Sequence, residues 1–250
     1  MSVALSVVIP TFNEAQNIAS CIQSVEELAD EIIVMDNFSS DGTADIARSM
    51  KASVFEREFD NFSLNKNAAI EKTTKDWILL LDADERLTPE LRTEIMQTIS
   101  APSASAYRIK RDTFYCGRKV RCWSNKSVTR LFRKGKARYD PAKLVHEELV
   151  VNGGGIETLQ HSLQHYTFRS FEQYLPKVHS FTTLAAREAF QKGNRAGLLS
   201  LSIYPLLRFV RTYFFKGGIL DGVPGLMISW LSAYTVYLKM AKLWELQNSR

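Results

Sequence analysis

The sequence predicts an α/β fold: a mixed, mainly parallel sheet flanked by helices, followed by a C-terminal helical extension. The first observation is Trp77–Leu81, five consecutive apolar residues. This run is too short for a globular helix and too continuous for a half-exposed strand, which indicates a buried strand of a parallel sheet. Strand and helix patterns alternate around it, as right-handed crossovers require. After residue 198 the chain becomes strongly apolar.

The elements of the first hundred residues follow from residue type and periodicity. Pro10 ends a β-branched run, and apolar residues at helical spacing follow it. Asp41 or Thr43 is expected to cap the helix that contains Ile46. In chain order, strands are expected at residues 3–10, 31–35, 52–55 and 77–81, and helices at residues 15–28, around Ile46, at 61–71 and at 89–99. Beyond them, residues 107–131 predict irregular strands or a mobile loop at the sheet edge.

The last eighty residues predict helices. Amphipathic spacing indicates a helix over residues 170–191, and we expect a domain over 1–190 and C-terminal helices over 191–250. Residues 222–238 are 17 uncharged residues that include two glycines and a proline. Because a spanning helix needs ~20 mainly apolar residues, we favour helices lying in a membrane interface, anchored by aromatic and basic residues. Packing of these helices on the globular domain is the alternative.

The charge of this 250-residue chain is unevenly distributed. Residues 108–143 hold 13 lysines or arginines and two aspartates, a net charge of +11; the whole chain carries +5, so the remainder carries −6. Such a basic stretch indicates an anionic partner: nucleotide phosphates, a phosphorylated acceptor, anionic lipid or nucleic acid. Aromatic residues among these cations, such as Trp123, suit a sugar ring beside phosphates or a single-stranded nucleic acid.

The cysteines and the N-terminal residues indicate the cellular compartment in which we expect the protein. The three cysteines, Cys21, Cys116 and Cys122, include no C-x-x-C pair, so we expect neither a disulfide framework nor a zinc site. A reducing cytoplasm fits best. The N-terminus shows no basic leader and no small-residue cleavage site, so we do not expect secretion.

Asp82 and Asp84 follow the buried strand, where ligands of open α/β sheets bind. In extended geometry both side chains would point the same way and could share one hard divalent cation. Mg²⁺ typically takes one or two protein carboxylates and completes its shell with water and substrate phosphate. A solvated turn that starts the next helix is the alternative.

Three further groups are candidates for chemistry. Asp36 ends the second strand, where a carboxylate can accept hydrogen bonds from a ribose or base. Because the chain lacks G-x-G-x-x-G and P-loop motifs, phosphate must be held by metal and side chains, and Lys66 offers a cation unless it lies on a solvated helical face. His146 beside Glu147 and Glu148 joins a possible metal ligand to a possible base, or is a structural histidine. For His161 and His165 a structural role is favoured.

Four ordered motifs then resemble the family 2 glycosyltransferases: Val7–Glu14, Asp36–Thr43, Asn65–Ala69 and Leu81–Glu85. The resemblance implies a GT-A fold, a nucleotide-sugar donor, Mg²⁺ or Mn²⁺, and inversion at the anomeric carbon. Residues 145–147 (V-H-E) look like the bacterial branch that acts on lipopolysaccharide core, of the core β-glucosyltransferase type. The chain lacks the Q-x-x-R-W signature of processive synthases, so we expect transfer of a single sugar.

The resemblance and the chemistry of the side chains together assign roles to individual residues. Donor contacts are expected from Thr11, Asn13, Glu14, Asp36, Lys66 and Asp82. Metal ligation is expected from Asp84 with help from Asp82 and His146, and the catalytic base is Glu147 or otherwise Glu148. Acceptor contacts are expected from Arg118, Arg121, Trp123 and Arg130, since guanidinium groups pair with phosphate oxygens.

We therefore expect an enzyme that transfers one sugar to a lipid-linked phosphorylated saccharide. The resemblance favours UDP-glucose as the donor. We expect no nucleic acid as a partner. The enzyme would lie on the cytoplasmic face of a bacterial inner membrane. Two alternatives remain. A nucleotidyltransferase making nucleotide sugars shares the sheet and acidic end but lacks its usual Gly-rich basic loop here. A non-catalytic membrane or nucleic-acid binding module leaves the acidic strand ends unexplained.

Overall fold

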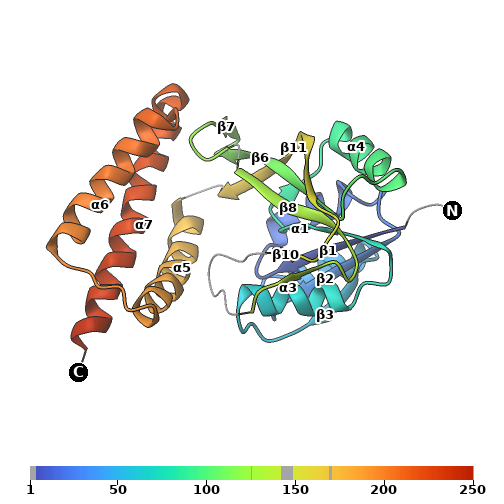
Figure 1. The fold of residues 1–250 in the computed structure, drawn as a ribbon, viewed down its shortest axis with the longest axis horizontal. Coiled ribbons are helices and arrows are strands. Elements are labelled where there is room, and N and C mark those ends of the chain that lie inside the picture. The colour runs from blue at the N-terminus through green and yellow to red at the C-terminus, as the bar shows by residue number, and fades with distance from the viewer. Residues whose placement is uncertain (1–3, 125, 142–148, 169–170, 250) are drawn as a thin grey trace. The chain divides into compact units, whose positions relative to one another are not determined.

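The computed structural model of the chain describes residues 4–124, 126–141, 149–168 and 171–249 (Figure 1). The chain forms two compact units, Met1–Arg111 with Lys126–His165, and Asp112–Asn125 with Tyr166–Arg250. The expected mixed, mainly parallel α/β fold with a C-terminal helical part is confirmed. The expected domain limits at residues 190 and 191 stay a prediction.

The N-terminal half of the main sheet is parallel. Its strands are β1 (Leu5–Thr11), β2 (Glu31–Asp36), β3 (Ser53–Glu56) and β4 (Trp77–Leu80). β1 pairs with both β2 and β4, and β2 pairs with β3, all in parallel. The connecting helices are α1 (Ala15–Gln23), α2 (Thr43–Ser49), α3 (Phe62–Glu71) and, after β4, α4 (Pro89–Ser100). The carboxyl ends of β1, β2 and β4 therefore lie at one edge, the binding edge of such sheets.

Helix starts follow local chemistry, with one correction. Asn61 caps α3 and Thr88 caps α4, each side chain accepting a hydrogen bond from the backbone N–H three residues on, at 2.9 and 3.2 Å. Pro89 opens α4, where its missing N–H costs nothing. The expectation that Asp41 or Thr43 caps α2 was wrong. Gly42 holds the cap position in a left-handed conformation (φ 85°), which glycine adopts without strain.

The second half of the sheet is antiparallel, and it corrects the placement of residues 107–131. These residues form β6 (Ala106–Tyr115), β7 (Arg118–Val120) and most of β8 (Lys126–Arg133). Among the described residues the strand order is β3-β2-β1-β4-β8-β6-β11-β5, with β11 at Ile156–Phe168 and β5 at Glu85–Arg86. β8 pairs directly with β4. The basic stretch therefore enters the middle of the sheet and not its edge. Its many lysines and arginines had suggested an exposed position.

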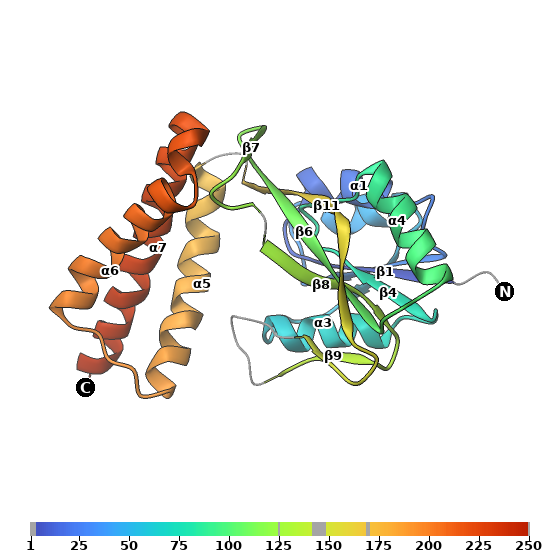
Figure 2. The same cartoon turned by 45° about the horizontal axis from the view of Figure 1, so that its top comes forward.

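Alternating side chains of the central strands build a core on each face of the sheet, as the pleat requires. Val7 and Leu79 pack with apolar residues of α1 and α4 on one face. Val8 and Leu80 pack with α3 and with β9 (Ala137–Tyr139) on the other. Figure 2 shows α1 and α4 on one side of the sheet and α3 on the opposite side.

A second, two-stranded sheet pairs β9 with β10 (Leu149–Val151). The Asn67 side chain on α3 links to β9, because its amide donates to the carbonyl of Tyr139 and accepts from the N–H of Tyr139, both at 2.9 Å. Asn67 is buried, so these two bonds satisfy its polar atoms. They attach α3 to β9 at the position next to Lys66.

The described part of the second unit is mainly helical; it also holds β7 and the ends of β6 and β11. Its helices are α5 (Phe171–Gln191), α6 (Leu198–Val210), a π turn η1 (Arg211–Phe215), a short 3-10 helix η2 (Gly218–Asp221) and α7 (Gly222–Asn248). Near the end of α7, Lys242 Nζ donates to the His179 carbonyl at 2.7 Å and to the hydroxyls of Thr182 and Thr183 at 2.8 Å. These bonds tie the last turns of α7 to α5.

One stretch of the described residues, Gly218–Asn248, is long and apolar enough to cross a membrane by length and composition: it has 31 residues, and its most apolar 18-residue window has a mean hydropathy of 1.2. A third of its most apolar window is buried within the helical unit.

Candidate active site

The ends of β1 and β2 place Thr11 and Asp36 side by side, since these residues are partners in the parallel register. The Asp36 carboxylate is buried and accepts hydrogen bonds from the N–H of Ser39 at 2.8 Å and from its hydroxyl at 2.6 Å. Among the described residues, the Thr11 hydroxyl oxygen is buried with no hydrogen-bond partner. A buried polar atom of this kind is costly unless a ligand satisfies it.

The loops after β1 and β2 are bound to one another. The Asn13 N–H donates to Ser39 Oγ at 2.8 Å, and Asn13 Oδ1 accepts from the N–H of Ser40 at 2.9 Å. The N–H of Glu14 donates to Thr43 Oγ1 at 2.8 Å. Asn13 has a φ of 52°, in the left-handed region that asparagine tolerates better than most residues. The expected donor contacts Thr11, Asn13, Glu14 and Asp36 are therefore brought to one edge of the sheet.

Asp82 lies between two cations after the end of β4. Arg130 Nη2 on β8 forms an ion pair with Asp82 Oδ2, and Lys66 Nζ on α3 lies 3.7 Å from Asp82 Oδ1. Lys66 also lies 5.3 Å from the centre of the Tyr139 ring, a cation–π distance. Burial alone would raise the pKa of Asp82, but the charges of Arg130 and Lys66 hold it well below its usual range.

Glu85, the first residue of β5, is fully buried and anchors the turn that carries both aspartates. Its carboxylate pairs with Arg130 at 2.8 Å and with Arg111 at 3.5 Å, and it accepts the N–H of Asp82 at 3.0 Å. Two cations and a backbone donor compensate the cost of burying this charge. Arg130, expected at the acceptor, instead has two carboxylates as neighbours, and its acceptor contact stays a prediction.

Asp84 faces His165, a histidine for which the sequence favoured a structural role. His165 Nε2 on β11 lies 3.5 Å from Asp84 Oδ2, and both side chains are largely buried, at 16% and 14% exposure. The antiparallel register pairs His165 with Glu85, which brings β11 to the turn. Burial lowers the pKa of His165, but the charge of Asp84 outweighs it and raises the pKa above its ordinary value.

The expectation that Asp82 and Asp84 continue an extended strand and point the same way was wrong. β4 ends at Leu80, and Asp84 lies in a turn rather than in an extended strand. The strand alternation therefore does not apply. The two aspartates have different neighbours: Asp82 faces Arg130 and Lys66, whereas Asp84 faces His165.

The turn that carries Asp84 suits a divalent cation whose coordination shell is completed by substrate. Within the described parts of the chain, no three His, Cys, Asp or Glu side chains form a metal-binding group. Asp84 and His165 supply one carboxylate and one imidazole at 3.5 Å, a donor pair compatible with Mn²⁺. A cation that keeps several positions for water and phosphate oxygens needs no more protein ligands than this.

The remaining predicted residues fall elsewhere. Arg118, Arg121 and Trp123 belong to the second unit, where Trp123 Nε1 donates to Ser232 Oγ at 3.1 Å and its ring stacks on Tyr174. His146, Glu147 and Glu148 lie outside the described residues.

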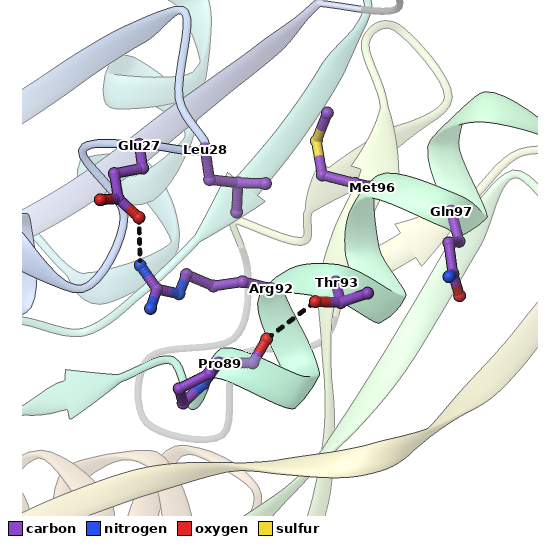
Figure 3. Close-up of a pocket in the computed structure, with 7 residues that line it drawn as sticks. All are labelled: Glu27, Leu28, Pro89, Arg92, Thr93, Met96 and Gln97. Carbon is purple, nitrogen blue, oxygen red and sulfur yellow. Dashed lines mark hydrogen bonds and ion pairs between the residues drawn. The ribbon is translucent and has the colours of Figure 1, made fainter.

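A surface hollow in the first unit carries none of the predicted site residues (Figure 3). Residues of α4 line it together with Glu27 and Leu28. Arg92 Nη1 pairs with Glu27 Oε2 at 3.0 Å across it. The ion pair links α4 to the segment after α1, which is a structural role.

The fold is that of a glycosyltransferase of GT-A type. It is similar over its whole length to the crystal structure of S. aureus TarS 1–349, with a TM-score of 0.52 and 14% identity, covering 99% of this chain and 92% of that one. This likeness concerns the fold alone.

The chain belongs to glycosyl transferase family 2, whose model matches residues 6–151. It is 31% identical over 255 residues to an uncharacterized glycosyltransferase of Rickettsia prowazekii, covering 97% of this chain and 87% of the relative. It is also 29% identical over 252 residues to the lipopolysaccharide core biosynthesis glycosyltransferase LpsC of Rhizobium meliloti, covering 96% and 92%. The chain is therefore an enzyme that transfers sugars, as its motifs predicted.

Proposed function

We propose that this chain transfers one sugar, from UDP-glucose, to a lipid-linked phosphorylated saccharide of the lipopolysaccharide inner core, with a divalent cation, Mn²⁺ or Mg²⁺. The observation that carries the proposal is the convergence of Thr11, Asp36, Lys66 and Asp84 at the carboxyl edge of β1, β2 and β4. The acceptor class is supported by the nearly full-length similarity to LpsC.

Each residue at this edge has a role in donor binding. The buried Thr11 hydroxyl and the Asp36 carboxylate lie where a nucleoside would be recognised, with Asn13 and Glu14 in the adjoining loop. Lys66, held over Tyr139 and beside Asp82, places a positive charge near the donor phosphates. Asp82 itself is fixed by Arg130, so its carboxylate remains ionised and positioned.

Asp84 and His165 would hold the cation. When bound, the metal supplies Lewis-acid stabilisation of the charge that develops on the leaving nucleoside diphosphate. Glu85 contributes by fixing the turn: its bonds to Arg130 and to the Asp82 N–H keep both aspartates in place. Such preorganisation matters because the reacting groups must be held in productive geometry.

Glu147, or otherwise Glu148, would take the proton from the acceptor hydroxyl as it attacks the sugar from the face opposite the leaving group. A base of this kind must lie within ~3 Å of the hydroxyl, directly or through one water. Inversion at the anomeric carbon follows from this single displacement. The basic residues Arg118 and Arg121 and the ring of Trp123 are proposed to meet the acceptor, and the enzyme is proposed to lie on the cytoplasmic face of the inner membrane.

The test is transfer by the purified chain from a panel of nucleotide sugars to lipopolysaccharide from a core-deficient strain, with Mn²⁺, Mg²⁺ or a chelator. We expect UDP-glucose to be used best and the chelator to abolish turnover. Glu147→Gln should bind donor as the wild type does and lose on the order of a hundredfold or more in turnover, as for loss of a general base. Glu157→Gln, which removes an exposed carboxylate of β11, is the control. Normal turnover in Glu147→Gln would rule out this base, and absence of any transfer with any donor would contradict the proposed reaction.

A further inference from the structure

The second unit exposes many large apolar side chains on consecutive elements. On α6, Leu198 is 83% exposed; on η1, Phe215 is 81% exposed; and on α7, Val223 is 70% exposed. Trp230 on α7 is also exposed, and its ring lies 4.6 Å from that of Phe209 on α6, which joins the two helices. Exposed apolar patches of this kind mark interaction surfaces of proteins or membranes.

Cations gather beside this apolar surface. Arg208, Arg211 and Lys216 lie on successive turns, because the N–H of Arg211 donates to the Arg208 carbonyl and the N–H of Lys216 donates to the Arg211 carbonyl, the latter at 3.0 Å. Burial, and then the positive charges of the two arginines, lower the pKa of Lys216. Arg121 of the hairpin adjoins them, because a methyl group placed on Gly217 would lie 3.7 Å from Arg121 Cβ. We call Arg121, Arg208, Arg211 and Lys216 the cation cluster.

No carboxylate balances the cation cluster within the part of the chain that the structure describes. None of its four side chains forms an ion pair with a described acidic residue. The nearby Asp221 carboxylate accepts hydrogen bonds from the backbone N–H groups of Arg121 and Cys122, at 2.7 and 3.1 Å, and its single negative charge offsets at most one of the four positive charges. Clustered cations without a counter-charge are unfavourable unless an external anion joins them.

Two buried polar atoms also lack partners at this place. Arg208 Nε on α6 and Thr212 Oγ1 on η1 are buried without a hydrogen-bond partner among the described residues. Thr212 is 1% exposed, so bulk water does not satisfy it. A donor and a hydroxyl in this state, beside three further cations, match the acceptor oxygens of a phosphoryl group.

We propose that the cation cluster binds the phosphoryl headgroups of anionic membrane phospholipids, while the apolar side chains of α6, η1 and α7 enter the acyl boundary. Charge beside apolar surface is the combination that interfacial helices use, with long basic side chains reaching the headgroups. The bonds of Lys242 to α5 keep α7 packed in its own unit, which favours a helix lying on the bilayer. This inference rests on the proposed function and specifies the class of membrane lipid that the enzyme binds.

The experiment is co-sedimentation of the full chain with vesicles of phosphatidylcholine alone or mixed with phosphatidylglycerol. We expect binding to the mixed vesicles that weakens as salt is raised, and far weaker binding to phosphatidylcholine. The variant R211Q/K216Q changes two side chains that reach the surface, and should weaken binding to mixed vesicles by roughly thirtyfold. Circular dichroism and thermal unfolding of each variant verify its fold.

The control R187Q/R195Q removes two exposed cations of the same unit that lie outside the cation cluster, and should bind within about threefold of the wild type. Equal weakening by both double variants, or unchanged binding by R211Q/K216Q, would overturn the proposal. UDP-glucose hydrolysis without vesicles is measured on the same samples. Vesicle binding without hydrolysis would support the lipid site and contradict the proposed reaction, and hydrolysis without vesicle binding would do the reverse.

Discussion

Arginines are central to both units, but their charges are balanced in opposite ways. In the first unit, Arg130 is buried between Asp82 and Glu85, and Lys66 faces Asp82 from the other side. In the second, Arg208 and Arg211 lie near Lys216 with no ion-paired carboxylate among the described residues. A balanced set of charges fixes a geometry, and an unbalanced set leaves capacity for an external anion.

Removing one charge from the balanced set should have the largest effect on stability. Arg130→Met leaves Glu85, which is fully buried, with Arg111 as its remaining basic partner, at 3.5 Å. Because breaking a buried pair leaves an uncompensated charge, we expect the free energy of unfolding to fall by about 3–5 kcal/mol. Urea denaturation measures this change.

The comparison supplies the control for this experiment. Arg211→Met removes the same group from the exposed, unbalanced set, and should alter the free energy of unfolding by less than about 0.5 kcal/mol. Replacing both partners, in Glu85→Gln with Arg130→Met, should recover part of the loss, since no lone charge remains buried. Equal stabilities of Arg130→Met and Arg211→Met would show that the two arginines are not in different electrostatic settings.

A third carboxylate, Glu94 on α4, tests a smaller effect in the first unit. It accepts hydrogen bonds from the N–H groups of Gln160 and His161 on β11, at 2.7 and 2.9 Å. Burial raises the pKa of Glu94, but these hydrogen bonds outweigh it and lower the pKa below its ordinary value. The stabilisation is thus present above the unfolded-state pKa of about 4.3 and is lost as pH falls through the lower folded-state pKa.

Glu94→Gln should therefore cost about 1–2 kcal/mol at neutral pH, the usual worth of hydrogen bonds to a charged group. The difference from the wild type should shrink as the pH is lowered past the folded-state pKa. Thermal unfolding across pH 2 to 7 follows this change, with the exposed Glu90 replaced by Gln for comparison. A constant difference at every pH would exclude the charge of Glu94 as its source.

The sequence predicted the positions of residues that depend on local sequence pattern and on the parallel half of the sheet. The apolar run at Trp77–Leu80 identified the buried strand, and alternating elements identified the parallel half of the sheet. The ordered motifs brought Thr11, Asp36, Lys66 and Asp84 into one site, because the carboxyl ends of parallel strands meet at one edge. These inferences needed only neighbours in sequence and a common topology.

Residues that depend on antiparallel pairing could not be predicted in this way. His165 reaches Asp84 because β11 pairs with β5, about eighty positions earlier in the chain. Residues 107–131 were expected to form irregular strands or a mobile loop at the sheet edge, yet Arg111 and Arg130 enter the sheet because Glu85 balances their charges. The turn at Ala83 and Asp84 likewise broke the strand alternation that was used to orient the aspartates.

The most direct test of the account is calorimetric titration of UDP-glucose into the wild-type chain and into Asp84→Asn, each with Mn²⁺ and with a chelator. The central claim is that Asp84, beside His165, holds a cation on which donor binding depends. The account predicts binding to the wild type with Mn²⁺, and a loss of at least about a hundredfold in affinity when either the cation or the Asp84 carboxylate is removed. Equal affinity in all four titrations would contradict it.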